Sequence, residues 1–150
     1  HGLLRRQRQM CIRDRHELDG RHCWCGRGGC LETFLSESGF EDDYEHITGE
    51  RHDAASIAAA AATGDIVADS VFQVFEDRLG RATATIISLF DPQMIILGGM
   101  VPLPERLETR VPRKWPGYVQ INRTKTLLSV SANGADALLK GAALLMSGKN

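Results

Sequence analysis

Hydrophobic positions recur at helical spacing through the middle of the chain and predict two consecutive helices. Apolar residues at three- and four-residue intervals predict one long helix from Asp65 to Leu89 or Phe90, ending just before a proline. The alanine-rich stretch before it predicts a shorter helix, with Asp53 as its N-cap and Gly64 at its end.

Two short apolar runs later in the chain predict β-strands. Residues 94–99 (MIILGG) place an apolar run directly before a glycine turn, and residues 126–131 (TLLSVS) form the second candidate. Helical spacing returns over 103–111 and again over 134–147. Because strands and helices alternate after residue 64, the pattern predicts an α/β architecture.

Patterning is weaker in the first third of the chain. Residues 16–30 contain four glycines, which forbid a regular helix and predict a loop. A helix can begin at Leu31, and a short amphipathic segment covers 40–47 before Gly49 stops it.

The composition is that of one globular domain. The chain has 150 residues, of which 43% are hydrophobic and 25% are charged. No apolar run approaches the roughly 18 residues that a membrane span needs. The basic N-terminus has no apolar region behind it, so no secretory signal is expected. We therefore expect a cytoplasmic protein without a membrane partner, whose thiols stay reduced.

Residues 1–15 differ from the rest of the chain. They carry a net charge of +4, and because the whole chain carries −1, residues 16–150 carry −5. The basic segment has neither aromatic interleaving nor a reader module behind it, which argues against nucleic-acid binding. Its string QRQMCIRDR resembles translated sequencing-adaptor sequence. We expect residues 1–15 to be non-native or disordered and residues 16–150 to form the domain.

Three cysteines lie close together in the predicted loop, in the sequence HCWCGRGGCLE at residues 22–32. Cys23, Cys25 and Cys30 have the spacing C-x-C-x4-C, with glycines between the second and the third. Thiolates bind zinc tetrahedrally, and glycines permit the tight turn that brings three thiols onto one ion. We interpret the cluster as a structural zinc site; buried or free cysteines without a metal are the alternative.

A structural zinc site needs a fourth ligand, and two histidines lie nearby. His16 belongs to the predicted loop and can fold back toward the thiols. His22 is adjacent to Cys23, which makes it awkward for both side chains to reach the same ion. A solvated histidine is the ordinary outcome at either position, so the fourth ligand stays unassigned.

The stretch CWCGRGGCLETFLSESGF resembles the zinc signature of the ROK family (repressors, open reading frames and kinases), which reads C-x-C-G-x-x-G-C-x-E. The residues that meet its fixed positions are Cys23, Cys25, Gly26, Gly29, Cys30 and Glu32. The local sequence looks most like the fructokinase-like branch. The resemblance continues through LFDPQMIILGG and GADALLKGAALL and covers residues 17–147. The chain departs from the family at Glu37, where a glycine commonly follows the serine.

This resemblance implies the C-terminal lobe of an actin-like ATPase (ribonuclease H-like) sugar kinase fold with a zinc-binding loop. It implies that Glu32 binds sugar hydroxyls and that Gly98 and Gly99 contact the nucleotide of ATP, which carries Mg²⁺. It also implies that the fourth zinc ligand is a histidine in an upstream Gly-His element, whose expected position falls within residues 1–15.

The implied activity is ATP-dependent phosphorylation of a hexose, with fructose favoured, by a protein that often forms homodimers. In the family, the N-terminal lobe carries a D-x-G-G-T phosphate loop and an aspartate base, and neither motif occurs in residues 1–150. We therefore assign no catalytic residue in this chain and expect it to be inactive alone. Two alternatives stay open: a sugar-responsive ROK transcriptional repressor, and a zinc-binding interaction module.

Overall fold

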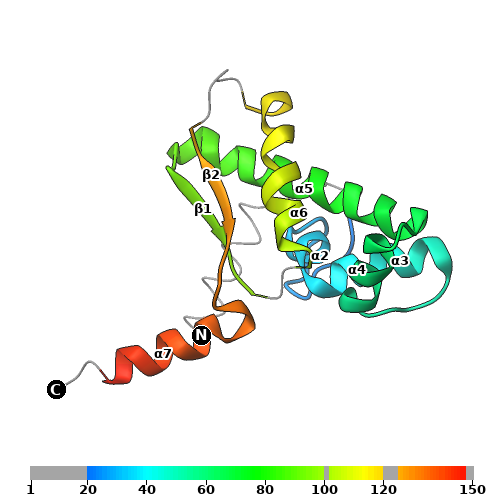
Figure 1. Ribbon diagram of the computed structural model, residues 1–150, viewed down its shortest axis with the longest axis horizontal. Coiled ribbons are helices and arrows are strands. Elements are labelled where there is room, and N and C mark those ends of the chain that lie inside the picture. The colour runs from blue at the N-terminus through cyan, green and yellow to red at the C-terminus, as the bar shows by residue number, and fades with distance from the viewer. Residues whose placement is uncertain (1–19, 100–101, 120–124, 148–150) are drawn as a thin grey trace.

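The computed structural model describes residues 20–99, 102–119 and 125–147 and shows an α/β arrangement around one long helix, α5 (Ile66–Phe90). Three helices pack around its N-terminal half: α2 (Glu32–Leu35), α3 (Glu37–Thr48) and α4 (Ala54–Ala62). A two-stranded sheet lies at its C-terminal end (Figure 1). The remaining elements are α6 (Pro104–Arg110), the 3₁₀ turns η1 (Pro112–Gly117) and η2 (Gly134–Asp136), and α7 (Ala137–Ser147).

Side-chain caps begin the two central helices as the sequence predicts. The Asp53 carboxylate accepts a hydrogen bond from the Ser56 amide at 2.6 Å, and the Asp65 carboxylate accepts one from Ala68 at 2.7 Å. Helix α5 ends at Phe90, and the residue that caps it, Asp91, adopts a left-handed conformation with φ +42°. The prediction of a long helix over 65–90 is therefore confirmed.

Helix α3 begins three residues earlier than the hydrophobic pattern predicts. Ser36 breaks the chain between α2 and α3, and its hydroxyl accepts a hydrogen bond from the Gly39 amide at 3.0 Å. Position 39 lies within the helix, and it needs a glycine because α2 passes very close to it. A Cβ atom there would be only 2.5 Å from the Thr33 carbonyl oxygen. The predicted stop at Gly49 is confirmed by its left-handed φ of +78°.

The sheet is parallel, as expected where a helix connects two strands. Strand β1 (Met94–Leu97) pairs with β2 (Leu127–Val130), with Met94 opposite Leu127 and Leu97 opposite Val130. Both predicted strands are thus confirmed, and with them the α/β class. The closing helix differs in one respect, because residues 134–136 form a 3₁₀ turn and the α-helix begins only at residue 137.

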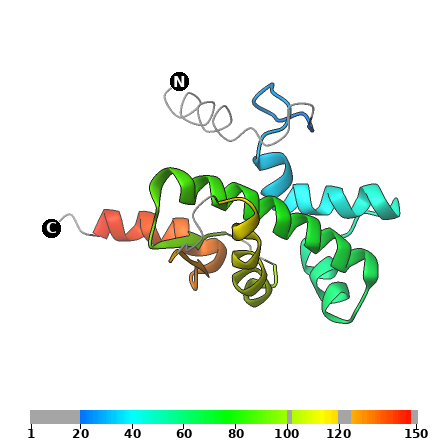
Figure 2. The same cartoon turned by 90° about the horizontal axis from the view of Figure 1, so that it is seen from above.

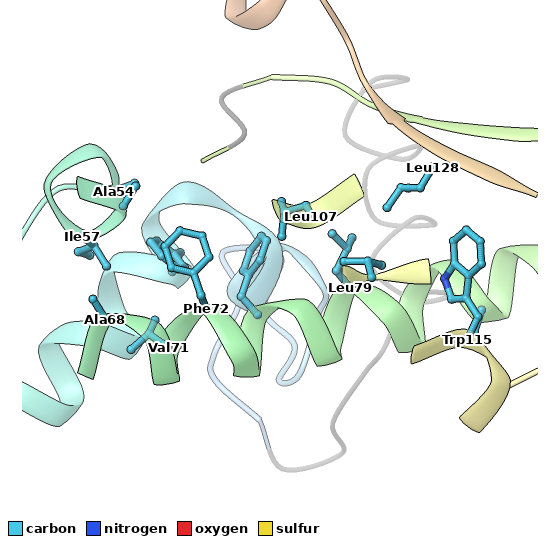
Figure 3. Close-up of a cluster of buried hydrophobic side chains, with 14 of the residues drawn as sticks. Ala54, Ile57, Ala68, Val71, Phe72, Leu79, Leu107, Trp115 and Leu128 are labelled. Carbon is cyan, nitrogen blue, oxygen red and sulfur yellow. The ribbon is translucent and has the colours of Figure 1, made fainter. Parts of the chain in front are cut away.

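The hydrophobic core lies along one side of α5 (Figure 3). Phe40 of α3 meets Phe72 and Phe75 of α5 edge-on, with ring centroids 4.8 Å and 5.5 Å apart. Buried side chains from the other elements complete the core: Ile57 from α4, Leu107 from α6, Trp115 from η1 and Leu128 from β2.

Buried polar contacts fix α6 and η1 on α5. Arg106 of α6 donates hydrogen bonds to Glu76 and Asp69 of α5, both at 2.5 Å, and only 2% of the Glu76 side chain is exposed. The Trp115 indole Nε1 donates a hydrogen bond to the Thr83 hydroxyl at 2.9 Å. These contacts orient the segment between the two strands.

Several large apolar side chains remain exposed at the sheet end of the molecule. Met94, Ile96 and Leu127 point outward from the sheet, and the exposed Leu139 and Leu145 belong to α7, which projects from the body (Figure 2). Within the described ranges, no single helix is long and apolar enough to span a membrane, although α4 and α5 together pass that test as a pair bent by 111°.

Candidate functional site

The cysteine loop is a tight turn held by backbone hydrogen bonds. The Cys23 amide donates to the Arg27 carbonyl at 2.7 Å, and the Gly29 amide donates to the Arg21 carbonyl at 2.9 Å. Gly26 and Gly29 adopt left-handed conformations, with φ of +84° and +73°. The glycines between the cysteines therefore supply the backbone freedom that the sequence predicted.

This turn brings the three predicted thiols together. The sulfur atoms of Cys23, Cys25 and Cys30 all lie within 4.8 Å of one another, and the Sγ atoms of Cys25 and Cys30 are 3.7 Å apart. Cys23 and Cys30 are buried, and none of the three cysteines forms a disulfide bond. The turn therefore brings three soft metal ligands together in a partly buried cluster.

The distance between two of the sulfur atoms agrees with zinc coordination. Zinc–sulfur bonds of about 2.3 Å in a tetrahedron place neighbouring sulfurs about 3.8 Å apart. The 3.7 Å between Cys25 and Cys30 agrees with that spacing. The donor set therefore matches a zinc centre that needs one more ligand, or an open position for water.

His22 does not lie with the three thiols. In the part of the chain that the structure describes, the ligand group contains the three cysteines and no histidine. His22 is exposed and pairs through its backbone with Gly28 in an isolated bridge. His16 lies outside the described residues, and so do residues 1–15, where the Gly-His element is expected.

Glu32 is placed directly after the loop, as the first residue of α2. Its side chain is exposed, so its carboxylate can accept hydrogen bonds from a bound molecule. The helix continues into the buried Phe34, which fixes the direction of α2 against the core. The position of Glu32 therefore depends on both the cysteine loop and α2.

A pocket of about 320 Å³ opens beside the carboxyl ends of both strands. Gly99 lines it from the turn after β1, and Gly134 lines it from the turn after β2. Both glycines adopt left-handed conformations, with φ of +91° and +56°. The other lining residues are Glu37, Ala54, Ala55, Ala58, Pro102, Pro104, Val130, Ser131 and Ala132.

The pocket contains some of the predicted site residues but not all. Gly99 lines it, whereas neighbouring Gly98 and the more distant Glu32 are not among its lining residues. A Cβ atom on Gly98 or Gly99 would meet nothing within 4 Å, so both glycines border open space. The lining is small and apolar apart from Ser131 and Glu37, which is the one titratable side chain among the lining residues.

Sequence reasoning did not assign Gly134 or the α4 alanines to a site. The signal for Gly134 was available, because ligands of open α/β sheets bind beyond the carboxyl ends of strands and both predicted strands lead to a glycine. The α4 alanines carried no such signal. Ala55 and Ala58 line the pocket only because α4 packs across α5 at a long sequence distance from the strands.

A parallel α/β unit with a pocket beyond its strand ends is typical of a domain that binds a small molecule. A sequence comparison makes the assignment specific. Residues 9–149 match the ROK family, so this chain belongs to the ROK family. The matched range begins inside residues 1–15, whose predicted non-native or disordered character stays a prediction.

Curated relatives of the chain include sugar kinases. The N-acetyl-D-glucosamine kinase of Pectobacterium carotovorum is 32% identical over 127 residues, which cover 82% of this chain and 40% of that kinase. The chain thus spans about two fifths of the curated relative that it matches. The fructokinase-like assignment finds no support in the name of this relative.

Solved structures of the same family include both a kinase and a regulator. A ROK glucokinase from Streptomyces griseus, in complex with glucose and AMPPNP, superposes with a TM-score of 0.71 at 26% identity, over 87% of this chain and 48% of that one. A ROK transcriptional regulator homologous to Escherichia coli MLC superposes with a TM-score of 0.66 at 28% identity, over 77% of this chain and 32% of that one. The expected ROK fold is confirmed for the part described.

Proposed function

We propose that this chain forms part of an ATP-dependent ROK sugar kinase that phosphorylates a hydroxyl of a hexose or an N-acetylhexosamine. The observation that carries the proposal is the pocket at the carboxyl ends of both parallel strands, bordered by Gly99 and Gly134. Its volume of about 320 Å³ lies within the range of small-molecule sites.

The pocket supports a role in nucleotide binding. Glycines without a Cβ atom at two strand ends let a ligand approach the backbone closely, as phosphates and purines require. The small apolar surface of α4, from Ala54 to Ala58, suits a flat aromatic base. We assign Gly98 and Gly99 to the nucleotide site, with Gly134 as an addition. ATP would bring Mg²⁺ with it.

Glu32 is our candidate for sugar binding. Its exposed carboxylate offers two acceptor oxygens to neighbouring sugar hydroxyls, and the ends of α2 are fixed by the loop and by Phe34. Cys23, Cys25 and Cys30 would hold a structural zinc ion that keeps the loop closed behind Glu32. The zinc ion supplies rigidity in this proposal and takes no part in phosphoryl transfer.

Catalysis in this proposal needs groups beyond this chain. A general base must lie within hydrogen-bond reach of the attacking hydroxyl, and phosphoryl transfer needs groups that position the phosphates. The D-x-G-G-T motif that the resemblance associates with these roles does not occur in residues 1–150. We therefore propose that the chain binds ligands but does not phosphorylate sugars by itself. The proposal also keeps a cytoplasmic location and a homodimeric parent protein.

A sugar-responsive ROK repressor is the second candidate, because a ROK transcriptional regulator superposes on 77% of the chain. The two candidates differ in their ligands. Both would bind a sugar near Glu32, but only the kinase needs ATP. Nucleotide binding therefore separates them, whereas sugar binding does not.

The sugar site is tested by replacing Glu32 with glutamine in the complete kinase that this proposal implies. ATP-dependent phosphorylation would be measured with D-fructose, D-glucose, D-mannose and N-acetyl-D-glucosamine. We expect at least about a tenfold rise in KM for the preferred sugar, because a neutral amide replaces a charged acceptor worth about 1.5–3 kcal/mol.

Glu105→Gln is the matched control, because Glu105 also lies in the first turn of a helix, α6. It removes a favourable helix-dipole interaction without touching the proposed sugar site. An unchanged KM in Glu32→Gln would overturn the assignment of Glu32. Activity with fructose alone would restore the fructokinase-like specificity.

A further inference from the structure

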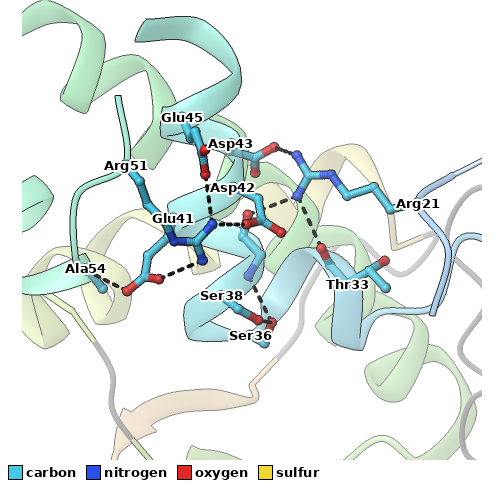
Figure 4. Close-up of polar contacts among 11 residues, drawn as sticks. Arg21, Thr33, Ser36, Ser38, Glu41, Asp42, Asp43, Glu45, Arg51 and Ala54 are labelled. Carbon is cyan, nitrogen blue, oxygen red and sulfur yellow. Dashed lines mark hydrogen bonds and ion pairs between the residues drawn. The ribbon is translucent and has the colours of Figure 1, made fainter. Parts of the chain in front are cut away.

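Asp43 of α3 lies between two arginines from distant parts of the chain. Its Oδ1 accepts a hydrogen bond from Arg21 Nη2, and its Oδ2 accepts one from Arg78 Nη1, both at 2.5 Å. Arg21 precedes the cysteine loop, and Arg78 belongs to α5. The contact between Arg21 and Asp43 is drawn in Figure 4. One carboxylate therefore joins the loop, α3 and the central helix.

The ring of Phe34 lies beside both guanidinium groups. The Cζ atoms of Arg78 and Arg21 are 4.5 Å and 5.3 Å from its centroid. Phe34 is buried, and the side chains of Asp43 and Arg78 are only 12% and 13% exposed. The charges of Asp43 and Arg78 are largely withdrawn from water, so each depends on its partners in the cluster for compensation.

Arg21 extends the cluster into the cysteine loop. Its Nη1 donates to the carbonyl oxygens of Gly39 at 3.0 Å and Thr33 at 3.3 Å. Its own carbonyl accepts the hydrogen bond from Gly29, the residue before Cys30. Arg21 also precedes Cys23 by two residues. The position of Arg21 therefore sets the spacing between the two ends of the loop.

We propose that Asp43 is a positioning residue for the metal loop, which through Arg21 keeps Cys23 and Cys30 close enough together to share a metal ion. The inference rests on the proposed function, which assigns the metal to these thiols. Without the Asp43 carboxylate, two guanidinium groups share one aromatic ring without a counter-charge. Arg21 is the more exposed of the two, at 30% against 13% for Arg78, so it is the one that turns to solvent and releases the loop.

The test compares Asp43→Asn with Asp42→Asn in the zinc-loaded chain. Asp42 is the neighbouring residue on α3, but it binds Arg51 at the surface instead of Arg21. The rate of zinc transfer to 4-(2-pyridylazo)resorcinol would be followed after mixing. We expect at least about a tenfold faster release from Asp43→Asn and no change in Asp42→Asn.

A second readout needs no metal. Hydrogen exchange of the Cys23 and Gly29 amides reports opening of the loop, because both amides are bonded across it. We expect exchange in Asp43→Asn to rise at least about tenfold at these two amides relative to the core of α5. Ile87→Val, a buried change on α5 that lowers global stability modestly, serves as the control for general destabilisation.

The outcomes separate the two proposals. Faster zinc release and faster loop exchange in Asp43→Asn alone support the positioning role. Wild-type rates in Asp43→Asn, or an equal acceleration in Ile87→Val, overturn it. If the wild-type chain retains no zinc, the metal part of the proposed function fails, and the exchange experiment still decides whether Asp43 positions the loop.

Discussion

The indole nitrogen of Trp115 donates a hydrogen bond to the hydroxyl of Thr83 at 2.9 Å, and both residues are buried. The same hydroxyl donates to the carbonyl of Leu79 at 2.7 Å, one turn earlier in α5. This short chain of hydrogen bonds fixes η1 on the central helix. It satisfies a donor that would otherwise be buried without a partner.

Thr83→Val should lower the free energy of unfolding by about 1–3 kcal/mol, because it leaves the Trp115 indole donor buried and unsatisfied. Urea unfolding followed by tryptophan fluorescence measures this change. Thr85→Val is the control, because Thr85 lies on the exposed side of α5 and its hydroxyl donates a hydrogen bond to the Arg81 carbonyl of the same helix. If Thr85→Val lowered the free energy of unfolding as much as Thr83→Val, the stabilising role of the Trp115–Thr83 hydrogen bond would be contradicted.

Gly39→Ala should destabilise the contact between α2 and α3. The added methyl group would lie 2.5 Å from the Thr33 carbonyl oxygen, which belongs to rigid backbone. We expect a loss of about 1–3 kcal/mol, as for other overpacked sites. Gly141→Ala on α7 provides the comparison, since its Cβ meets nothing within 4 Å and alanine favours a helix by about 1 kcal/mol. Equal thermal midpoints for the two variants would rule out the close approach.

The ion pair between Asp69 and Arg106 makes part of the stability depend on pH. The hydrogen bond from Arg106, followed by that from Gln73, holds the pKa of Asp69 below its ordinary value. A lowered pKa in the folded state contributes stability above the unfolded value of about 3.9, and this contribution is lost as the pH falls through the folded pKa.

Asp69→Asn should therefore lower the urea midpoint at about pH 7, and this difference from wild type should shrink as the pH falls through the folded pKa of Asp69. Because the ion pair is partly exposed, the loss in the free energy of unfolding should stay within about 1 kcal/mol. Asp136→Asn, a change at an exposed aspartate in η2, corrects for the general effect of removing one negative charge. A difference between Asp69→Asn and wild type that persists at low pH would show that the effect is not electrostatic.

The outer face of the sheet should make the chain self-associate when it is studied alone. Parallel sheets are normally covered on both faces, yet Met94, Ile96 and Leu127 are exposed on one face here. The double variant Ile96→Thr/Leu127→Thr should shift the chain toward monomer in sedimentation-velocity runs at several concentrations. Ile47→Thr, at an isolated exposed position on α3, should leave the distribution unchanged. An identical distribution for all three proteins would exclude the sheet face as the contact.

The sequence predicted the elements whose signals are local. The long run of apolar spacing defined α5, and the caps Asp53 and Asp65 defined the starts of α4 and α5. The start of α3 was missed because glycine disfavours helices. A glycine is needed at this helical position because the Thr33 carbonyl passes close to it. That contact is a matter of tertiary packing, and no local sequence pattern reports it.

In the candidate site, too, the local features could be predicted from the sequence and the long-range contacts could not. The spacing of Cys23, Cys25 and Cys30 predicted that the thiols would meet, since the whole cluster lies within eight residues. The pocket could be predicted only in part, because Gly99 follows a strand whereas Ala55 comes from a helix about 40 residues away. The pairing of Asp43 with Arg21 and Arg78 spans 22 and 35 residues, and no periodicity reports contacts of that range.

Nucleotide binding tests the central claim most directly, and it can be measured on the chain as it exists. A fluorescent ATP analogue would be titrated into the wild type, Ala55→Phe and Ala59→Phe. Ala55 and Ala59 are both exposed on α4, but only Ala55 lines the pocket. The account predicts binding by the wild type and Ala59→Phe, with at least about a tenfold weaker affinity in Ala55→Phe. A folded wild-type chain that binds no nucleotide, or equal affinities in all three proteins, would contradict the kinase assignment.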